Sequence, residues 1–344
     1  MAAPLPTGHS GVKLPKFAPD LTAVEDLDEE PVAFAVAHDG SKGARACIDL
    51  AYNQYFPKKP NSTVEIVHIY DTTAQGDLMR PFKKDVIASD ITALDIAHGD
   101  RFKLLMLEKV EKEGKQLCEW TMKREQKGQC IDFMLMGFKG GKNASEEQLL
   151  ASDVSYALAY SRCSMIVLRD WVPAEDAPNQ KLHYLVPVDL SKWSEKAFHD
   201  ALVLSSPGDK ITVLRVIFED DADKKSQVAY YEKLIDRVSK KFHKPRNIQL
   251  VTVNSGGAGV SETILKWADE SETDVDFICM GTNVKRLQQA KSYLGSVSGN
   301  VLLKSRYPMV IARYDEDFES VISNASRAKV MFPDKLETSI LPKS

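Results

Sequence analysis

Short apolar runs alternate with longer amphipathic stretches along most of this chain. Each apolar run is bounded by polar or turn residues, which predicts a buried strand, whereas apolar residues at helical spacing predict the helices between the runs. Strands and helices in alternation indicate an α/β fold with a parallel sheet and right-handed crossovers. We predict strands at residues 32–37, 64–70, 102–107, 133–137, 165–169, 184–188, 212–218, 248–253, 277–281 and 309–313.

The helical pattern is clear in most of the intervening segments and is weakest between residues 71 and 129. Within that segment, residues 102–107 fit either a strand or the start of a helix, and we interpret them as a strand. The turn Gly295-Ser296-Val297-Ser298 opens the last helix. We predict the other helices at residues 44–55, 86–98, 116–124, 147–160, 194–204, 229–241 and 261–270.

The second half of the chain repeats the first. An earlier motif, Asp39-x-Ser41, recurs as Asp189-x-Ser191 at an offset of 150 residues. Later identities recur at a fixed offset of 144 residues, which is not expected by chance and predicts two halves with one fold. They are Asp132-Phe133 with Asp276-Phe277, Met136-Gly137 with Met280-Gly281, Ser152 with Ser296, Ser161-Arg162 with Ser305-Arg306, Met165 with Met309, and Arg169 with Arg313.

Shifts in composition divide the chain further. Residues 1–30 carry four prolines and end in an acidic run, which predicts a flexible arm. Residues 171–180 contain two prolines and two acids and predict a linker. We therefore expect an arm at 1–30, domains at 31–170 and 181–316 joined by the linker at 171–180, and a tail at 317–344.

Charge and hydropathy narrow the classes of function. With 344 residues the chain is long enough for two cores, and its net charge of −4 gives no overall basic field for nucleic acid. No apolar run approaches the roughly 20 residues of a membrane span, and the N-terminus lacks the apolar core of a signal peptide. We therefore expect a cytoplasmic protein that binds neither nucleic acid nor membrane.

Cysteine and histidine usage gives little support for a metal site. The five cysteines are odd in number, contain no C-x-x-C pair and mostly lie in apolar runs, so we interpret them as reduced core residues. The seven histidines form no H-E-x-x-H motif. We expect no metal site formed by protein side chains alone.

Three features in a fixed order are similar to the universal stress protein family. They are Asp-x-Ser after the first strand of each half, a glycine that ends the fourth, and Gly-Ser-Val-Ser before the last helix. VPVDLSKWSEKAF, SETILKWADE, DFICMG and LGSVSGNVLLKSRYPMVIAR follow the family in order. The resemblance covers about residues 31–170 and 180–316, so the chain resembles a tandem universal stress protein.

The resemblance implies the fold of each half. We expect two flavodoxin-like, adenine nucleotide alpha hydrolase-like domains, each a doubly wound sheet of five parallel strands in the order 3-2-1-4-5. Members often dimerise through their last strands. We therefore expect the strands at 165–169 and 309–313 to pair within this chain and to form an intrachain pseudo-dimer.

Some members of the family bind ATP or another adenine nucleotide, others bind none, and the family is non-catalytic or at most weakly hydrolytic. In binding members the motif is Gly-x-x-Gly, nine residues, then Gly followed by Ser or Thr. The second half departs from it, because Val284 replaces the middle glycine and the spacing is one residue longer. Lys285, Arg286 and Lys291 lie in the same loop and could neutralise phosphate charge.

For the second half, the resemblance implies a site for ATP or another adenine nucleotide, with Mg²⁺ only alongside the nucleotide and with no catalytic residue. Asp189 would lie near the sugar and Val216 would contact the adenine through its backbone. The phosphates would lie against Gly281, Gly295, Ser296, Val297 and Ser298. The alternative interpretation is that Ser296 is an ordinary helix N-cap, Gly295 serves a turn and the lysines are solvated.

The first half departs from the motif in a different way. It keeps Gly137 and Gly140 but has Ala151 in place of the third glycine. Asp153 would stand beside any phosphate and repel it, so we expect no nucleotide in the first half.

Two classes of function remain open. One is a non-catalytic stress-response or signalling protein that holds a nucleotide in its second half. The other is a nucleotide-free scaffold that binds protein partners through residues 1–30 and 317–344. The broken motifs favour the second class, and the intact Gly-Ser-Val-Ser together with Asp189 favour the first.

Overall fold

The computed structural model describes residues 31–71, 101–139, 150–172, 180–218, 224–240, 242, 246–271, 274–282 and 294–313. The predicted arm, most of the linker and the tail, and the helix expected at 86–98, lie outside these ranges. The strands are β1 (Ala33–Ala37), β2 (Thr63–Tyr70), β3 (Phe102–Glu108), β4 (Phe133–Gly137), β5 (Ser164–Leu168), β6 (His183–Val188), β7 (Lys210–Ile217), β8 (Asn247–Asn254), β9 (Phe277–Gly281) and β10 (Met309–Ala312).

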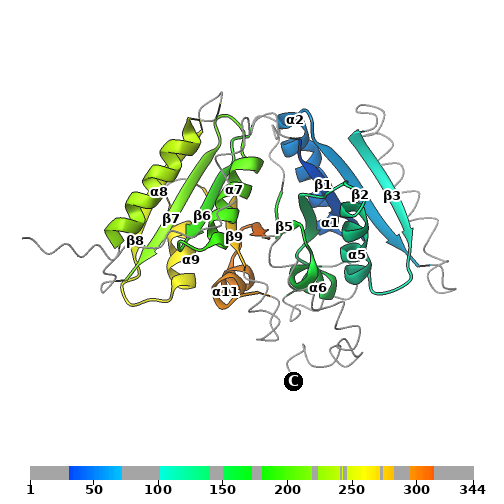
Figure 1. Ribbon diagram of the computed structural model, residues 1–344. Coiled ribbons are helices and arrows are strands. Elements are labelled where there is room, and N and C mark those ends of the chain that lie inside the picture. Colours follow the sequence, from blue (N-terminus) through cyan, green and yellow to red (C-terminus); the bar gives the residue numbers. More distant parts are fainter. Residues whose placement is uncertain are drawn as a thin grey trace, which may run out of the picture.

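In the described part of the chain, one ten-stranded sheet runs through both halves in the order β3-β2-β1-β4-β5-β10-β9-β6-β7-β8. Figure 1 shows the halves side by side, with β3 and β8 at the outer edges. Each half therefore has the predicted order 3-2-1-4-5, and residues 102–107 form the predicted strand. Neighbouring strands run parallel except β5 and β10, which pair antiparallel with Val310 opposite Ile166. The predicted pairing of the last strands is confirmed.

Helices cover both faces of the sheet. They are α1 (Lys42–Leu50), which continues as the π-helical turn η1 (Ala51–Tyr55) and α2 (Phe56–Lys58), then α5 (Glu113–Glu125), α6 (Ser152–Tyr160), α7 (Lys192–Leu204), α8 (Lys224–Ser239), α9 (Val260–Glu270) and α11 (Ser296–Lys304). The repeated Asp-x-Ser motif marks the first helix of each half. Ser41 and Ser191 are N-caps whose hydroxyls accept the amides of Ala44 at 3.1 Å and Ser194 at 3.2 Å.

Two helices begin five residues away from the starts that the apolar pattern predicted. The helix expected at 147–160 begins only at Ser152, because the amide of Ala151 donates to the carbonyl of Phe138 at 3.2 Å and holds the chain extended. Helix α8 begins at Lys224 rather than at 229 and ends at Ser239 rather than at 241. Its polar first turns are held by Gln227, which accepts the Nε of Arg215 at 2.9 Å, so apolar periodicity could not mark its start.

The core consists of two apolar clusters, one on each face of the sheet. Alternate residues of each strand belong to different clusters, as the pleat requires. One cluster includes residues of α1, α7 and α8, and the other includes residues of α5, α6, α9 and α11. Each cluster contains residues from both halves, so the seam between the halves is part of a continuous core.

The repeated Asp-Phe pair has a structural role in both halves. Asp132 accepts the amide of Ala33 at 2.7 Å, and Asp276 accepts the amide of His183 at 2.7 Å. Each aspartate thus fixes the start of the central strand, and the phenylalanine after it stacks on an aromatic ring of that strand. This shared anchoring explains why the pair recurs in the sequence.

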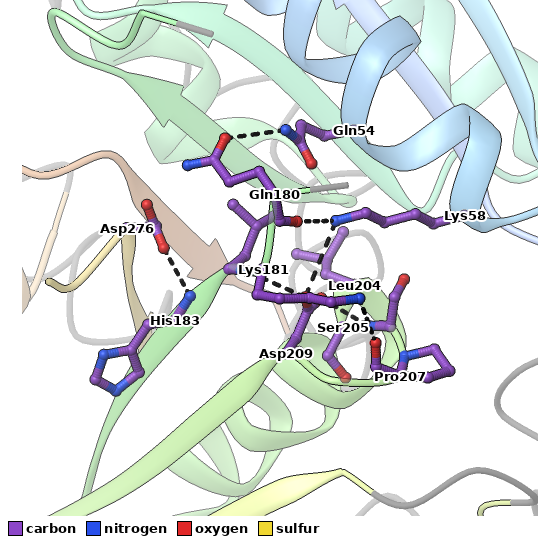
Figure 2. Close-up of polar contacts among 12 residues, drawn as sticks. Gln54, Lys58, Gln180, Lys181, His183, Leu204, Ser205, Pro207, Asp209 and Asp276 are labelled. Carbon is purple, nitrogen blue, oxygen red and sulfur yellow. Dashed lines mark hydrogen bonds and ion pairs between the residues drawn. The ribbon is translucent and has the colours of Figure 1, made fainter. Parts of the chain in front are cut away.

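Polar contacts close the seam where the second domain begins (Figure 2). Lys58 reaches from the first half and donates to the carbonyl of Gln180 at 2.7 Å, with Asp209 3.9 Å from its ammonium nitrogen. Gln54 donates to the side chain of Gln180 at 3.1 Å. Burial lowers the pKa of Lys58, and Asp209 opposes this shift. The last residue of the predicted linker therefore connects the two halves directly.

Candidate functional site

The carboxyl ends of β6 and β7 bring two of the predicted site residues together. Val188 pairs with Arg215, so Asp189 and Val216 follow on neighbouring strands at one edge of the sheet. Asp189 is exposed, and its carboxylate accepts the amide of Ser191 at 3.1 Å. This bond shapes the turn that starts α7 and leaves Asp189 in contact with solvent, at the place where a ligand's hydroxyl groups could reach it.

Leu190 adopts a backbone conformation that side chains rarely accept. Its φ is +64°, and the matching residue of the first half is Gly40, with φ +81°. The amide of Leu190 donates to the hydroxyl of Tyr231 at 2.9 Å. Burial raises the pKa of Tyr231, so this hydroxyl stays protonated and holds the strained turn from α8.

One backbone group of Val216 already has a partner within the protein. Val216 is buried, and its carbonyl accepts a hydrogen bond from the guanidinium of Arg215 at 2.7 Å. Arg215 is in turn held by Gln227 of α8. One lone pair of the Val216 carbonyl is therefore already engaged within the protein, and the predicted backbone contact to adenine stays a prediction.

Gly281 is required by packing, whatever it does for a ligand. A Cβ atom at this position would lie 2.0 Å from the carbonyl oxygen of Trp193, so β9 ends against the first turn of α7. The carbonyl of Gly281 accepts the hydroxyl of Ser298 at 3.1 Å. Strand β9 and helix α11 are thereby joined at the edge of the sheet where the site was predicted.

The N-terminus of α11 is the part of the predicted site that best suits an anion. Gly295 is its N-cap, with extended backbone and no side-chain capping bond, and the first turn contains no acid. Ser296 is exposed and Val297 is half-buried, while Ser298 is buried. The interpretation of Ser296 as an N-cap is wrong, since it is the first helical residue. Main-chain N–H groups at such a helix end attract phosphate.

Thr282 belongs to this site although the sequence analysis did not name it. It follows Gly281 directly, is 2% exposed, and its buried hydroxyl oxygen makes no hydrogen bond to any residue that the structure describes. A buried hydroxyl without a partner is rare in proteins and suggests a missing acceptor or donor. The available signal was a hydroxyl residue placed directly after the strand-ending glycine.

Val284, Lys285, Arg286 and Lys291 lie outside the described residues. Their predicted roles in the loop before α11 stay predictions. The described ranges contain no cluster of three or more histidine, cysteine or acidic side chains that could hold a metal ion. Nor does any helix in these ranges have the length and apolar content needed to span a bilayer.

In the first half, the N-terminus of the corresponding helix, α6, packs against the start of α5. Asp153, in the first turn of α6, accepts the amide of Gly114 at 2.8 Å and so caps the start of α5. A Cβ atom on Gly114 would lie 2.8 Å from the backbone oxygen of Asp153, which shows how tightly the two helix starts pack. Gly137 packs in the same way against Gly43, and Gly140 lies outside the described residues.

Comparisons with known proteins agree with this architecture. Residues 183–313 match the model of the universal stress protein family. A universal stress protein from Archaeoglobus fulgidus is 17% identical, with 83% of this chain and 97% of that chain covered and a TM-score of 0.59. A Pseudomonas aeruginosa protein, described as a putative universal stress protein, is 10% identical, with 87% of this chain and 99% of that chain covered and a TM-score of 0.55.

A universal stress protein in complex with cAMP is 14% identical, with 41% of this chain and 98% of that chain covered and a TM-score of 0.30. The structures from Archaeoglobus fulgidus and Pseudomonas aeruginosa establish likeness of fold across most of the chain. No curated protein matches the sequence.

Proposed function

We propose that this chain, which belongs to the universal stress protein family through residues 183–313, binds one adenine nucleotide in its second half. The first half repeats the strand order of the second. In this proposal the first half holds no nucleotide and has a structural role. The protein acts as a non-catalytic stress-response or signalling protein, whose bound nucleotide changes the stability of the paired halves.

The contrast between the two helix N-termini carries this proposal. Val297, in the first turn of α11, occupies the position of Asp153 in the first turn of α6. An acid at that position places a negative charge where a phosphate would lie, and Asp153 is also committed to the amide of Gly114. Of these two helices, α11 alone therefore presents an uncharged first turn at the edge of the sheet.

Several neutral donors surround the proposed phosphate position. The amides of Ser296 and Val297 lie in the first turn of α11, and the hydroxyl of Thr282 has no hydrogen-bond partner among the described residues. Hydroxyl and amide donors match the oxygen atoms of a phosphate group. Asp189, exposed at the neighbouring strand end, would accept from the sugar hydroxyls.

Binding without hydrolysis fits these residues. The described side chains provide no three-residue metal cluster, so Mg²⁺ would arrive with the nucleotide phosphates rather than occupy a site formed by the protein alone. The carboxylate of Asp189 already accepts the amide and the hydroxyl of Ser191. We therefore expect ATP incubated with the protein to stay intact, as measured by chromatography of the nucleotide after prolonged incubation.

The proposal is tested first on the protein as purified. The fresh full-length chain is denatured, and released nucleotides are identified by chromatography. Saturating ATP added to stripped protein should raise the melting temperature, because a ligand that binds only the folded state stabilises it. The absence of released adenine nucleotide, together with an unchanged melting temperature, would reject nucleotide binding.

A nucleotide-free scaffold is the second candidate, and the engaged carbonyl of Val216 favours it. In that case residues 1–30 and 317–344 would bind protein partners. Deleting either segment should then abolish partner capture while leaving the melting temperature of the remaining chain insensitive to ATP. Loss of capture combined with an ATP-dependent melting temperature would show that both functions coexist.

A further inference from the structure

A cavity with both polar and apolar walls lies at the seam between the halves, separate from the proposed nucleotide site. Its volume is about 150 Å³, and its walls come from the start of β1, the end of α5, the loops before β4 and β5, helix α7 of the second half, and the residue after β10. Since one water needs roughly 10–15 Å³ of such space, the cavity is large enough for several waters or one small polyatomic ion.

Basic groups from separate elements line this cavity. Arg162 comes from the loop before β5, Lys196 and His199 from α7, and Arg313 from the end of β10. Arg313 is only 1% exposed, so the cavity touches a guanidinium that is almost completely removed from water. A guanidinium offers five N–H donors in a planar fork that suits oxyanions.

The acids on the wall are already committed to other groups. Asp200 is fully buried, accepts the hydroxyl of Ser164 at 2.6 Å and pairs with Lys196. Burial raises the pKa of Asp200, but Lys196 and His199 outweigh it and hold the pKa below its usual range.

The other two acids have equally clear partners. Glu125 pairs with Arg162 at 2.9 Å, and Asp132 anchors β1. The nitrogen Nδ1 of His199 lies 3.6 Å from the carboxylate of Asp200, so this ring also faces an acid on the wall.

The pseudo-equivalent region of the seam shows a contact of related chemistry. There, the start of the second domain meets the first half, and Gln54 and Lys58 both donate to Gln180 (Figure 2). The backbone carbonyl of Gln180 accepts from the cation Lys58. At the offset of 150 residues that relates β6 to β1, Gln180 corresponds to Glu30, the last residue of the acidic run Glu25–Glu30.

We propose that the seam cavity is a binding site for an oxyanion. Two sources share this chemistry, namely a small free oxyanion such as inorganic phosphate, and the carboxylates of the acidic run in the same chain. Either one would connect Arg313 of the second half with Arg162 of the first and so strengthen the seam.

Binding of inorganic phosphate to the full-length chain tests the proposal. Equilibrium dialysis with radiolabelled phosphate is performed in chloride buffer, with saturating ATP present to block the proposed nucleotide site. A second chain carries Glu25→Gln, Asp26→Asn, Asp28→Asn, Glu29→Gln and Glu30→Gln. Binding of one phosphate by the wild-type chain identifies a free anion as the ligand. If phosphate binds only to the chain with the neutralised run, the acidic run is identified as the group that occupies the cavity in the wild-type chain.

In the chain that binds, Arg313→Gln should weaken phosphate binding roughly tenfold or more, because the variant loses a charged guanidinium that donates to the anion. Arg169→Gln, at the repeated position, should leave it unchanged, because Arg169 instead donates to the carbonyls of Leu303 and Ser305. If Arg313→Gln does not fold, the partly exposed Arg162→Gln replaces it, with the same expected loss. No phosphate binding by either chain, or full binding by the arginine variant, would overturn the proposal.

The experiment also separates this site from the nucleotide site. Val297→Asp places an acid at the start of α11, and it should leave phosphate binding at the seam intact. Undiminished ATP binding by this variant would contradict only the proposed function, whereas loss of its phosphate binding would show that the two sites are not separate.

Discussion

At the scale of single residues, Gly281 shows that a glycine assigned to a ligand can be fixed by packing alone. We expect Gly281→Ala to lower the free energy of unfolding by about 3 kcal/mol or more, the upper end of overpacking effects. The physical reason is the 2.0 Å approach of a Cβ atom to the carbonyl oxygen of Trp193. Urea denaturation would measure this loss.

The matched control is Gly295→Ala. A Cβ atom on Gly295 has no neighbour within 4 Å, and its φ of −60° suits any residue. The change in stability should therefore be less than about 1 kcal/mol, as for other replacements at an N-cap. Equal losses in the two variants would show that the close contact with Trp193 does not determine the role of Gly281.

Asp276 gives the protein a specific dependence on pH. Burial raises its pKa to about 6, and nearby Asp209 and Asp274 add to the shift, while its bond from His183 opposes it. In the unfolded chain an aspartate titrates near 3.9. As the pH falls from 7 towards 4, the folded protein therefore takes up a proton before the unfolded chain does, so this group contributes increasing stability.

We therefore expect Asp276→Asn to remove that increase and to be more stable than the wild type at pH 7. The expected gain is about 1 kcal/mol, discounted because the carboxylate is only partly buried. Asp132→Asn, at the repeated position, controls for loss of the strand anchor. Urea midpoints measured between pH 4 and 7 would check it, and parallel profiles for wild type and Asp276→Asn would contradict it.

At the scale of elements, the N-terminus of α6 differs from that of α11, and stability measurements can detect the difference. Asp153 caps α5 through the amide of Gly114, so Asp153→Ala should cost about 1 kcal/mol. Asp153→Asn keeps an acceptor oxygen and should lose less. Chemical denaturation would compare the two, and an unchanged stability for Asp153→Ala would mean that this bond contributes nothing to α5.

Elements could be predicted from the sequence where the same packing contact recurs in both halves. Features that depend on contacts between residues far apart in the chain could not be predicted. Asp132 and Asp276 recur because each fixes the start of a central strand, and Gly137 and Gly281 recur because each ends a strand against a helix. The start of α6 was missed because Leu150 extends the apolar pattern, while a bond to the preceding strand end keeps the chain extended.

The candidate site was predicted only in part for the same reason. Asp189 and the turn at 295–298 lie at one edge of the sheet, as the strand order requires. The bond from Arg215 to the carbonyl of Val216 depends on α8, and no local motif announces it. The buried hydroxyl of Thr282 becomes informative only when its lack of a partner is known.

At the scale of the whole molecule, the shared sheet and the two shared apolar clusters predict a single cooperative unit. Ser164 of the first half donates to Asp200 of the second, and the β5–β10 pair lies at the same seam. Two variants that each retain one tryptophan, Trp120 in the first half or Trp267 in the second, should show coincident urea transitions by fluorescence. Separate transitions would show that the halves unfold independently.

The central claim is that the chain has one nucleotide site, at the start of α11, and isothermal titration of ATP into the nucleotide-stripped protein tests it most directly. We expect one ATP per chain, unchanged binding by Asp153→Asn, and a loss of at least roughly tenfold in affinity for Val297→Asp, because the new carboxylate repels phosphate. Two nucleotides per chain, none, or undiminished binding by Val297→Asp would contradict it.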